Sequence, residues 1–223
     1  MTDRQDPWLF LTSANVSDAL RSKGKAFQAM DGGIRPLQAS MRVAGPAFTV
    51  RCFPGATWAL EQALELATPG DVLVVDGGGY PDVILMGGLM SMRAQSRGLG
   101  GAILDAAVRD VDQIVALGFP VFSRHICPRA GTFAQVGEWQ TTVCCGRIPV
   151  RPKDWIVADQ SGITVVPAEL LDEVLEEAIA IHDRETAIEY HLRQGKTLAD
   201  SAAAANAPKP AQRRNVGAAA PTH

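Results

Sequence analysis

The stretch DVLVVDGGG, residues 71–79, decides the fold class, because it joins a β-branched apolar run to three consecutive glycines. Thr68-Pro69-Gly70 precedes it, and an apolar run this short between turn residues is typical of a buried strand. Outward from this strand, helical and strand patterns alternate from about residue 57 to residue 124. This alternation predicts βα crossovers and a sheet that is at least partly parallel.

The other elements follow from the hydrophobic period and from the signals at helix ends. Ser13 is a candidate N-cap for the first helix. The pattern predicts helices over residues 13–23, 57–67, 83–97 and 111–117, and strands over residues 43–53, 71–76, from 102 onward, and over 119–122. Residues 138–166 hold short β-rich pieces between turns, which predict an antiparallel meander. A long helix should follow over residues 167–194, ended by Gly195.

Length and composition predict one α/β domain followed by a tail. The chain has 223 residues, 47% of them apolar and 20% charged, which is ample for a single large core. We expect this domain to span residues 1–200. Residues 201–223 are rich in Ala and Pro, and we expect them to form a mobile tail.

The charge and the apolar pattern argue against several classes of protein. A formal charge of −3 gives no basic face for nucleic acid. No apolar stretch approaches the length of a membrane span, and the first ten residues lack the apolar segment of a secretory signal. The four cysteines form no CxxC pair, which favours reduced thiols in a cytoplasmic protein.

The three glycines at residues 77–79 invite a nucleotide-binding interpretation, but the spacing does not support it. The sequence from Gly77 is G-G-G-Y-P-D, so the third glycine of GxGxxG is missing and Pro81 lies in the turn. A tight turn between a strand and a helix is the better prediction. The chain also lacks GxxxxGK[ST], the P-loop motif.

Arg109-Asp110 is more informative, because it follows an apolar strand and begins a helix. Ligands of α/β sheets collect at the carboxyl ends of strands. Arg109 offers a planar fork that matches a carboxylate, and Asp110 offers a hard oxygen ligand for Mg²⁺ or Mn²⁺. The spacing equally allows a solvated ion pair in which Asp110 serves as a helix N-cap.

Gly87-Gly88-Leu89-Met90 forms a second candidate segment. Glycines let a backbone approach a ligand closely, and free N–H groups there bind anions. The alternative is a helix that packs tightly against the sheet.

Several motifs, taken in order, resemble one protein family. They are DVLVVDGGG, GGLM, GAILDAAVRDVDQI, LGFPVFSR and DWIVADQSGITVVP. Together they resemble the RraA-like family, which includes regulators of ribonuclease activity A and the 4-hydroxy-4-methyl-2-oxoglutarate / 4-carboxy-4-hydroxy-2-oxoadipate aldolases. The resemblance covers roughly residues 15–195. It implies an αββα sandwich similar to the swivelling phosphohistidine domain, with mixed sheets and a long C-terminal helix, assembled as a homotrimer or homohexamer.

The resemblance also implies roles for single residues. Arg109 matches the arginine that grips the carboxylate of a pyruvyl group, and Asp110 matches the metal-binding aspartate. Backbone N–H groups of Leu89 and Met90 would hold the substrate. A glutamate from the C-terminal helix of a neighbouring subunit would face the metal, and Glu185 is the best match, ahead of Glu189.

The chain departs from both subgroup patterns of the family. The aldolases carry Asp, then twenty residues, then Arg-Asp. Residues 89–108 are the twenty here, so that leading position is Gly88. The regulator branch carries glycine there, with an acidic residue three places after the Asp, and that residue is Gln113 here. The missing leading carboxylate leaves the substrate and the aldolase rate open.

The resemblance therefore predicts a lyase: a metal-dependent class II pyruvate aldolase that also decarboxylates oxaloacetate. Both reactions pass through a pyruvate enolate, whose charge a divalent ion and Arg109 would stabilise. The five lysines lie neither in an apolar strand nor beside the glycine-rich turns, which disfavours imine chemistry. Two alternatives stay open: a non-catalytic regulator of ribonuclease activity, and a different lyase or hydrolase that acts on a related oxo-acid.

Overall fold

The computed structural model describes residues 7–206. The described chain divides into two units, of which the first ends at Ile181 and the second begins at His182. The division falls inside the long helix near the C-terminus, whereas the sequence predicted one domain up to residue 200.

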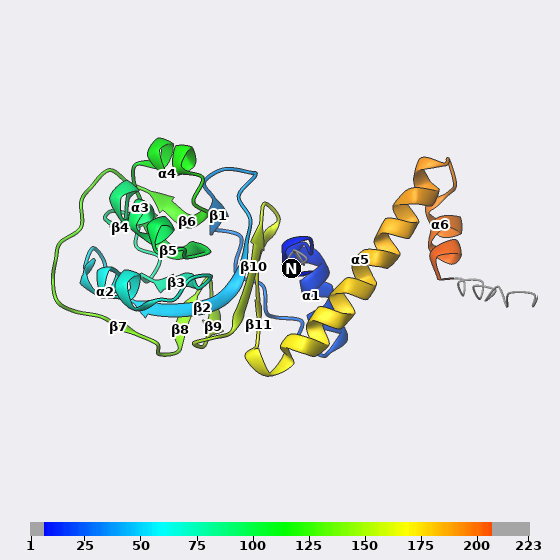
Figure 1. Ribbon diagram of the computed structural model, residues 1–223, viewed down its shortest axis with the longest axis horizontal. Helices are drawn as coiled ribbons and strands as arrows, with labels where there is room; N and C mark the ends of the chain where they lie inside the picture. Colours follow the sequence, from blue (N-terminus) through cyan, green and yellow to red (C-terminus); the bar gives the residue numbers. More distant parts are fainter. Residues whose placement is uncertain (1–6, 207–223) are drawn as a thin grey trace, which may run out of the picture. The chain divides into compact units, whose positions relative to one another are not determined.

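The first unit is built on a nine-stranded mixed sheet in the order β1-β6-β5-β3-β2-β10-β11, with β4 beside β5 and β7 beside β2. Its strands are β1 (Arg35–Pro36), β2 (Val43–Arg51), β3 (Val72–Asp76), β4 (Ile84–Met86), β5 (Gly101–Val108), β6 (Val121–Ile126), β7 (Glu138–Trp139), β10 (Trp155–Asp159) and β11 (Gly162–Val166). Strands β2, β3, β5 and β6 pair in parallel, which confirms the prediction from the alternating pattern. Figure 1 shows β2 as the last strand of this parallel part, between β3 and β10.

The prediction of one antiparallel meander over residues 138–166 is wrong. The β7 strand pairs with β2, while β8 (Val143–Cys145) and β9 (Ile148–Val150) form a separate hairpin. Only β10 and β11 form a hairpin on the main sheet, next to β2. Short β-rich pieces have the same local pattern in either arrangement, so their partners depend on the rest of the fold.

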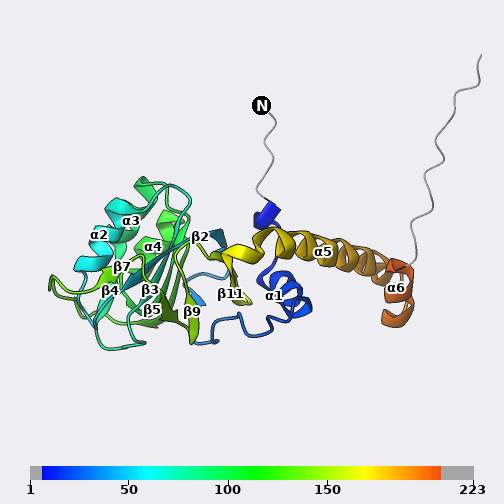
Figure 2. The ribbon, with the colours of Figure 1, turned by 90° about the horizontal axis from the view of Figure 1, so that it is seen from below.

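The helices are α1 (Ser13–Ser22), α2 (Trp58–Leu66), α3 (Gly88–Ser96), α4 (Val111–Leu117), α5 (Leu171–Arg193) and α6 (Leu198–Ala205), with 3₁₀ turns at Pro7–Leu9 and Ala168–Leu170. In the first unit, α3 contacts both α2 and α4, and Figure 2 shows the three helices side by side. The predicted helix over residues 111–117 is confirmed, and Gly118 ends it in the left-handed conformation that glycine favours.

Two predicted helix starts differ from the structure. Thr12, not Ser13, is the N-cap of α1, because its hydroxyl accepts the Asn15 N–H while Ser13 binds the Asp159 carboxylate. The helix expected over residues 83–97 is a strand, β4, followed by α3. The buried strand β4 pairs with β5 and is too short to show a period of its own.

The expected tail begins with ordered structure. The α6 helix covers the first residues of the segment predicted as irregular, with Thr197 as its N-cap and Ser201 buried. Its hydrogen bonds are local, and alanine is a strong helix former. The sequence prediction took the Ala-rich composition as a sign of a mobile tail and so missed this helix. Residues 207–223, the rest of that segment, lie outside the described residues.

The core of the first unit consists of two clusters of buried apolar side chains. The larger one surrounds the parallel strands, and every residue of β5 is buried. The smaller one joins α1 to β10, β11 and the start of α5. The structure thus confirms a mixed α/β fold with a long C-terminal helix, whereas the likeness to a swivelling phosphohistidine domain stays a prediction. In the described chain, no helix combines the length and the apolar character needed to cross a membrane.

Candidate functional site

The residues predicted to bind ligand meet at one cavity of the first unit. Arg109 and Asp110 directly follow β5, at the edge where parallel strands end. The cavity has a volume of about 200 Å³. Its lining residues are Thr57, Ile84, Gly87, Leu89, Met90, Arg109, Asp110, Ala130 and Gly131. The fold therefore brings together two segments that are about twenty residues apart in the sequence.

Asp110 is held in an uncommon backbone conformation. Its φ of 58° and ψ of 39° lie in the left-handed region, which a residue other than glycine rarely adopts. Such conformations cost on the order of 1–3 kcal/mol and cluster at functional sites. Asp110 occupies the N-cap position of α4, but its side chain makes no capping hydrogen bond. Instead, its Oδ2 accepts the backbone N–H of Gly88 at 3.0 Å.

This contact places a carboxylate at the amino end of α3, where the helix dipole favours negative charge. The alternative that the sequence left open, an N-cap at α4, is therefore not supported by the side-chain contacts. The other carboxylate oxygen, Oδ1, accepts no hydrogen bond from the described residues. The Asp110 side chain is 40% exposed.

Arg109 is oriented by its backbone and keeps its side chain available. Its N–H donates to the carbonyl of Met86 at 3.2 Å. Its Nε lies 3.4 Å from Asp110 Oδ2, yet this buried Nε has no hydrogen-bond partner. We regard the pair as a charge contact with poor hydrogen-bond alignment. By contrast, Arg93 binds both oxygens of Glu65. The Arg109 guanidinium donates no hydrogen bond to the described chain and is 40% exposed.

Gly87 is close to the two charged side chains, and Gly88 is close to Gln113. A Cβ atom at Gly87 would lie 2.8 Å from Asp110 Oδ2 and 3.2 Å from Arg109 Cγ. A Cβ atom at Gly88 would lie 2.0 Å from Oε1 of Gln113. The glycines therefore provide the space that Arg109, Asp110 and Gln113 occupy.

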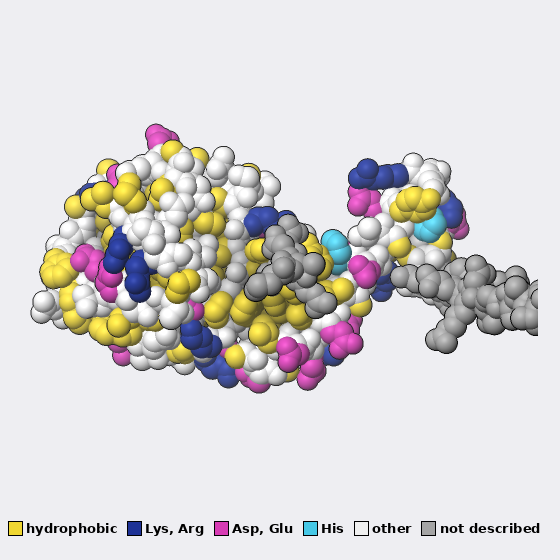
Figure 3. Space-filling model, viewed as in Figure 1, with side chains coloured by type: hydrophobic (Ala, Val, Ile, Leu, Met, Phe, Trp, Pro, Cys, Tyr) yellow, Lys and Arg dark blue, Asp and Glu magenta, His cyan; other side chains and the backbone are white. Residues whose placement is uncertain are grey.

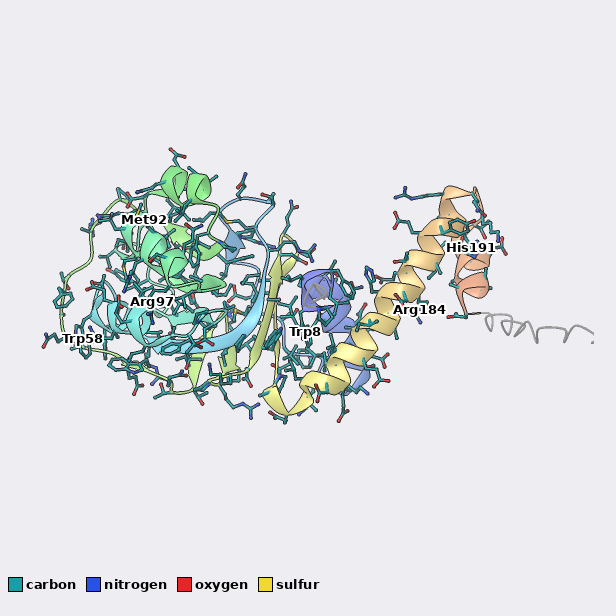
Figure 4. The ribbon with its side chains drawn as sticks, in the orientation of Figure 1. Trp8, Trp58, Met92, Arg97, Arg184 and His191 are labelled. Atoms are coloured by element: carbon teal, nitrogen blue, oxygen red, sulfur yellow. The ribbon has the colours of Figure 1, made fainter. Side chains whose placement is uncertain are left out.

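Leu89 and Met90 contribute the first turn of α3 to the cavity lining. The N–H groups of a first helical turn have no acceptor within their own helix, so they can bind an anion. The Leu89 side chain is 76% exposed. Figure 4 shows Met92 on the same helix, and Figure 3 shows that hydrophobic side chains reach the surface over α2 and α3.

Three further residues of the cavity lining were not predicted from the sequence. Ala130 and Gly131 lie in the loop after β6, and Thr57 lies at the start of α2. The Thr57 N–H donates to the carbonyl of Thr132 at 3.0 Å, which ties this loop to α2. The loop follows the parallel strand beside β5, so the rule about strand ends that selected Arg109 also applied here.

A second cavity, of about 330 Å³, also borders this pair. It is lined by Arg109, Asp110, Val111, Ile126, Cys127 and Pro128. The backbone of Cys127 is anchored to β5, because its N–H donates to the carbonyl of Val108 at 3.0 Å. Arg109 and Asp110 therefore border two cavities at once.

Glu185, the predicted second metal ligand, lies on α5 in the second unit, and its side chain is exposed. The runner-up Glu189 pairs with Arg193 one turn further along the helix. A metal ligand from the neighbouring subunit, with Glu185 as the best match, stays a prediction.

The glycines at residues 77–79 form the tight turn that the sequence favoured over a nucleotide site. Gly78 and Gly79 have φ values of 68° and 67°, in the left-handed region. Gly79 N–H donates to the carbonyl of Asp105 at 2.9 Å. The turn follows β3 and connects it to β4 without opening a helix there.

An ion-pair network beside this turn ties three segments together. Arg124 on β6 donates to both carboxylate oxygens of Asp31, at 2.9 and 2.8 Å, and also pairs with Asp105 on β5. The hydrogen bond from Arg124 lowers the pKa of Asp31 from its ordinary value of 3.8 to about 2. This network is structural, because its charged groups satisfy one another.

The four cysteines are free thiols that differ in exposure. Adjacent residues Cys144 and Cys145 face opposite sides of their strand, the first exposed and the second buried. Burial raises the pKa of the Cys52 thiol to about 12, and burial also raises the pKa of Cys145. Cys127 is partly exposed.

Comparison with known proteins places this arrangement in a family. The RraA-like family, described as Aldolase/RraA, matches residues 13–165. A Halalkalibacterium halodurans protein named "Putative 4-hydroxy-4-methyl-2-oxoglutarate aldolase" is 34% identical over 163 residues, which are 73% of this chain and 76% of that protein. The crystal structure of an uncharacterized protein from Pseudomonas syringae pv. tomato is similar with a TM-score of 0.78 and 28% identity, covering 88% of this chain and 94% of the other.

A third similar protein carries the other activity named in the family. It is the RNA-processing inhibitor RraA from Thermus thermophilis, with a TM-score of 0.59 and 26% identity over 62% of this chain and 84% of that one. The segment matched by the family includes the whole of the first cavity, from Thr57 to Gly131. The chain belongs to the RraA-like family.

Proposed function

We propose that this protein is a divalent-metal-dependent class II pyruvate aldolase of the 4-hydroxy-4-methyl-2-oxoglutarate / 4-carboxy-4-hydroxy-2-oxoadipate type, with oxaloacetate decarboxylation as a side activity. One observation carries the proposal: an arginine whose side chain donates no hydrogen bond within the described chain and an anchored carboxylate share a cavity with the amino end of α3. The aldolase name of relatives at about 30–34% identity supports a lyase.

Arg109 would bind the carboxylate of the 2-oxo acid. Its planar fork can donate two parallel hydrogen bonds, and the side chain donates none within the described chain, where its nearest anionic contact is Asp110 Oδ2 at 3.4 Å from Nε. The N–H groups of Leu89 and Met90 lie on the same cavity and would donate to the other oxygens of that group. Together these donors would fix the pyruvyl end of the substrate.

Asp110 fits a divalent ion of the hard, oxygen-preferring kind. Its Oδ1 is free of hydrogen bonds, and Mg²⁺ is commonly bound through one or two carboxylates together with waters and substrate. The described residues of one chain contain no group of three or more His, Cys, Asp or Glu side chains placed for a metal, so further ligands would come from water, substrate or Glu185 of a neighbouring subunit. When bound, Mg²⁺ or Mn²⁺ supplies Lewis-acid stabilisation of the charge that develops on the 2-oxo acid.

The reaction is a retro-aldol cleavage. The hydroxyl on C4 loses its proton, the C3–C4 bond breaks, and its electron pair passes to C3 as the enolate of pyruvate, which then takes up a proton. Arg109 stabilises this developing anion through the bound carboxylate. Among the described residues that line either cavity there is no lysine, so an imine route has no amine at this site.

A regulator of ribonuclease activity is the second candidate, and Gly88 favours it because the regulator branch carries glycine at that position. The similarity to RraA of Thermus thermophilis supports the same alternative. A different lyase or hydrolase on a related oxo-acid is the third candidate. Turnover separates these possibilities, because a pure binding protein produces no pyruvate.

The experiment is a pyruvate assay with purified protein. We expect pyruvate from 4-hydroxy-4-methyl-2-oxoglutarate and, more slowly, from oxaloacetate in the presence of Mg²⁺ or Mn²⁺. Excess EDTA should abolish both activities, and added Mg²⁺ or Mn²⁺ should restore them. Full activity in excess chelator would contradict metal dependence, and no pyruvate from either substrate would contradict the aldolase.

A further inference from the structure

The two cavities border Arg109 and Asp110 and differ in the other segments that line them. The first includes Thr57 and, from the amino end of α3, Leu89 and Met90. Among the described residues that line the second, Arg109 and Asp110 are the only charged ones, and the others are Val111, Ile126, Cys127 and Pro128. A ligand held at the shared pair can therefore extend from the amino end of α3 to the apolar side chains of the second cavity.

We propose that the second cavity holds the substituent on C4 of the substrate and selects an apolar one, with Ile126 as the main determinant of specificity. This inference rests on the proposed function, since it assumes a 2-oxo acid bound by Arg109. It deepens that function by choosing between its two substrates: a 4-methyl substrate is preferred over a 4-carboxymethyl one.

The position of Ile126 follows from β6. It is the last residue of the strand, and its side chain is 65% exposed at the rim of the cavity. The preceding residue, His125, lies within 3.1 Å of the carbonyl of Gly79 through its Nε2. Successive side chains of a strand point to opposite faces, so Ile126 faces away from that contact.

The chemistry of the cavity decides between the two substrates. A methyl group gains from contact with Ile126 and Val111, because apolar surface leaves water. Both substrates carry one carboxylate on C1 and one attached to C4, and a carboxymethyl group adds a third. Among the described residues that line this cavity, the only cation is Arg109, which already holds the pyruvyl carboxylate. Burying the third charge without a partner is unfavourable. An apolar pocket commonly discriminates by about 10- to 200-fold for a group of this size.

The test compares the specificity constant, kcat/KM, for 4-hydroxy-4-methyl-2-oxoglutarate and 4-carboxy-4-hydroxy-2-oxoadipate. We expect the wild-type protein to favour the methyl substrate by at least about tenfold. In Ile126→Lys, the new ammonium should pair with the carboxylate of the carboxymethyl group, which the methyl substrate lacks, and lower this ratio by at least about tenfold. Phe27→Lys is the matched control: Phe27 is 90% exposed and lines neither cavity, so the ratio should not change.

Oxaloacetate decarboxylation by the wild-type protein separates this inference from the proposed function. If the protein decarboxylates oxaloacetate but shows equal constants for the two aldol substrates, or if Ile126→Lys leaves their ratio unchanged, the inference is wrong and the function stands. If no substrate is turned over, the proposed function fails, and binding at the second cavity must be measured directly.

Alkylation of Cys127 supplies that direct measurement. Cys127 lines the second cavity, whereas the exposed Cys144 does not and serves as an internal reference. We expect 4-methyl-2-oxopentanoate, which has a branched apolar end and no hydroxyl to cleave, to slow iodoacetamide labelling of Cys127 severalfold, as measured by peptide mass spectrometry. Pyruvate, which lacks that end, should protect Cys127 less. Equal labelling of Cys127 with and without 4-methyl-2-oxopentanoate, at concentrations that saturate pyruvate binding, would overturn the inference.

Discussion

At the scale of single residues, the site depends on a division of labour between two neighbours. Asp110 is held in a left-handed conformation and turned toward the amino end of α3, while Arg109 keeps its guanidinium free of hydrogen bonds. Neighbouring residues with such different environments should fail in different ways when changed. Replacing each of the two residues by a close chemical analogue is therefore the most informative test.

Arg109→Lys keeps the charge and loses the two-pronged geometry, so it should raise the KM for the 2-oxo acid and lower kcat. Asp110→Asn keeps the shape and loses the anionic ligand, so it should raise the metal concentration needed for half activity. Each loss should be about 30- to 1,000-fold, as expected for charge-assisted contacts worth about 2–4 kcal/mol. Steady-state kinetics with titrated Mg²⁺ measures both effects.

Arg93→Lys is the matched control for the arginine change. Arg93 also forms a two-pronged contact, with Glu65, but lies outside both cavities. It should keep near wild-type kinetics. If both site variants stayed folded with near wild-type turnover, Arg109 and Asp110 would be no more than a surface ion pair.

Asp31 should make the stability of the protein depend on pH at the acid end. Its pKa is lowered to about 2 in the folded protein, mainly by the hydrogen bond from Arg124. The unfolded chain binds a proton at higher pH than the folded one, so this stabilisation is complete above about pH 4 and is lost as pH falls toward 2. Urea unfolding at several pH values should show Asp31→Asn destabilised near neutrality and approaching wild type in acid. A difference that stayed constant from pH 6 to pH 3 would contradict this role.

At the scale of elements, the amino ends of α3 and α4 share one small volume. The first residue of α3 is Gly88, and the amide of Gln113 on α4 occupies the space that a side chain there would need. Gln113 makes no hydrogen bond within the described chain, so its position reflects packing over the glycine. The two positions should therefore be coupled energetically.

Gly88→Asp should destabilise the protein and reduce activity, because its Cβ would lie 2.0 Å from Gln113 Oε1. Gln113 is a flexible side chain, so we expect a moderate loss, about 1–3 kcal/mol, rather than failure to fold. Gln113→Ala in the same chain should recover most of this loss, whereas Gln113→Ala alone should have a small effect. A double-mutant cycle by chemical denaturation measures the coupling, and simple additivity would show that the two positions do not share space.

At the scale of the whole molecule, the resemblance makes a prediction about assembly. The resemblance predicts a trimer or hexamer in which Glu185 reaches the Asp110 of a neighbouring subunit. Sedimentation should accordingly find a trimer or larger assembly at assay concentration. An active monomer would contradict this arrangement.

Complementation tests whether Glu185 and Asp110 act across subunits. Asp110→Asn and Glu185→Gln proteins should each have low activity. Mixed assemblies, made by dissociating and reassociating the two variants together, should regain part of the wild-type activity, because some interfaces then combine an intact Asp110 with an intact Glu185. Glu189→Gln is the control and should behave like wild type. Mixed assemblies no more active than the separate variants would contradict a shared site.

The sequence by itself determined the α/β class, the parallel strands and the position of Arg109 and Asp110 directly after a buried strand. These features depend on local signals: apolar runs of strand length, turn residues between them, and charged residues directly after a buried strand. The α4 helix was predicted with its observed bounds because Gly118 is a local stop signal that no tertiary contact overrides.

Only the tertiary structure decided which strands pair, where β4 ends and α3 begins, and which segments close the site. The loop with Ala130 and Gly131 faces Arg109 because β6 lies beside β5, and the carbonyl of Arg129 accepts the N–H of Ile84 at 3.1 Å. Likewise, the left-handed backbone of Asp110 depends on its contact with Gly88 across two elements. Contacts between distant segments leave no periodic signal in either segment, so the chain must fold before they can be seen.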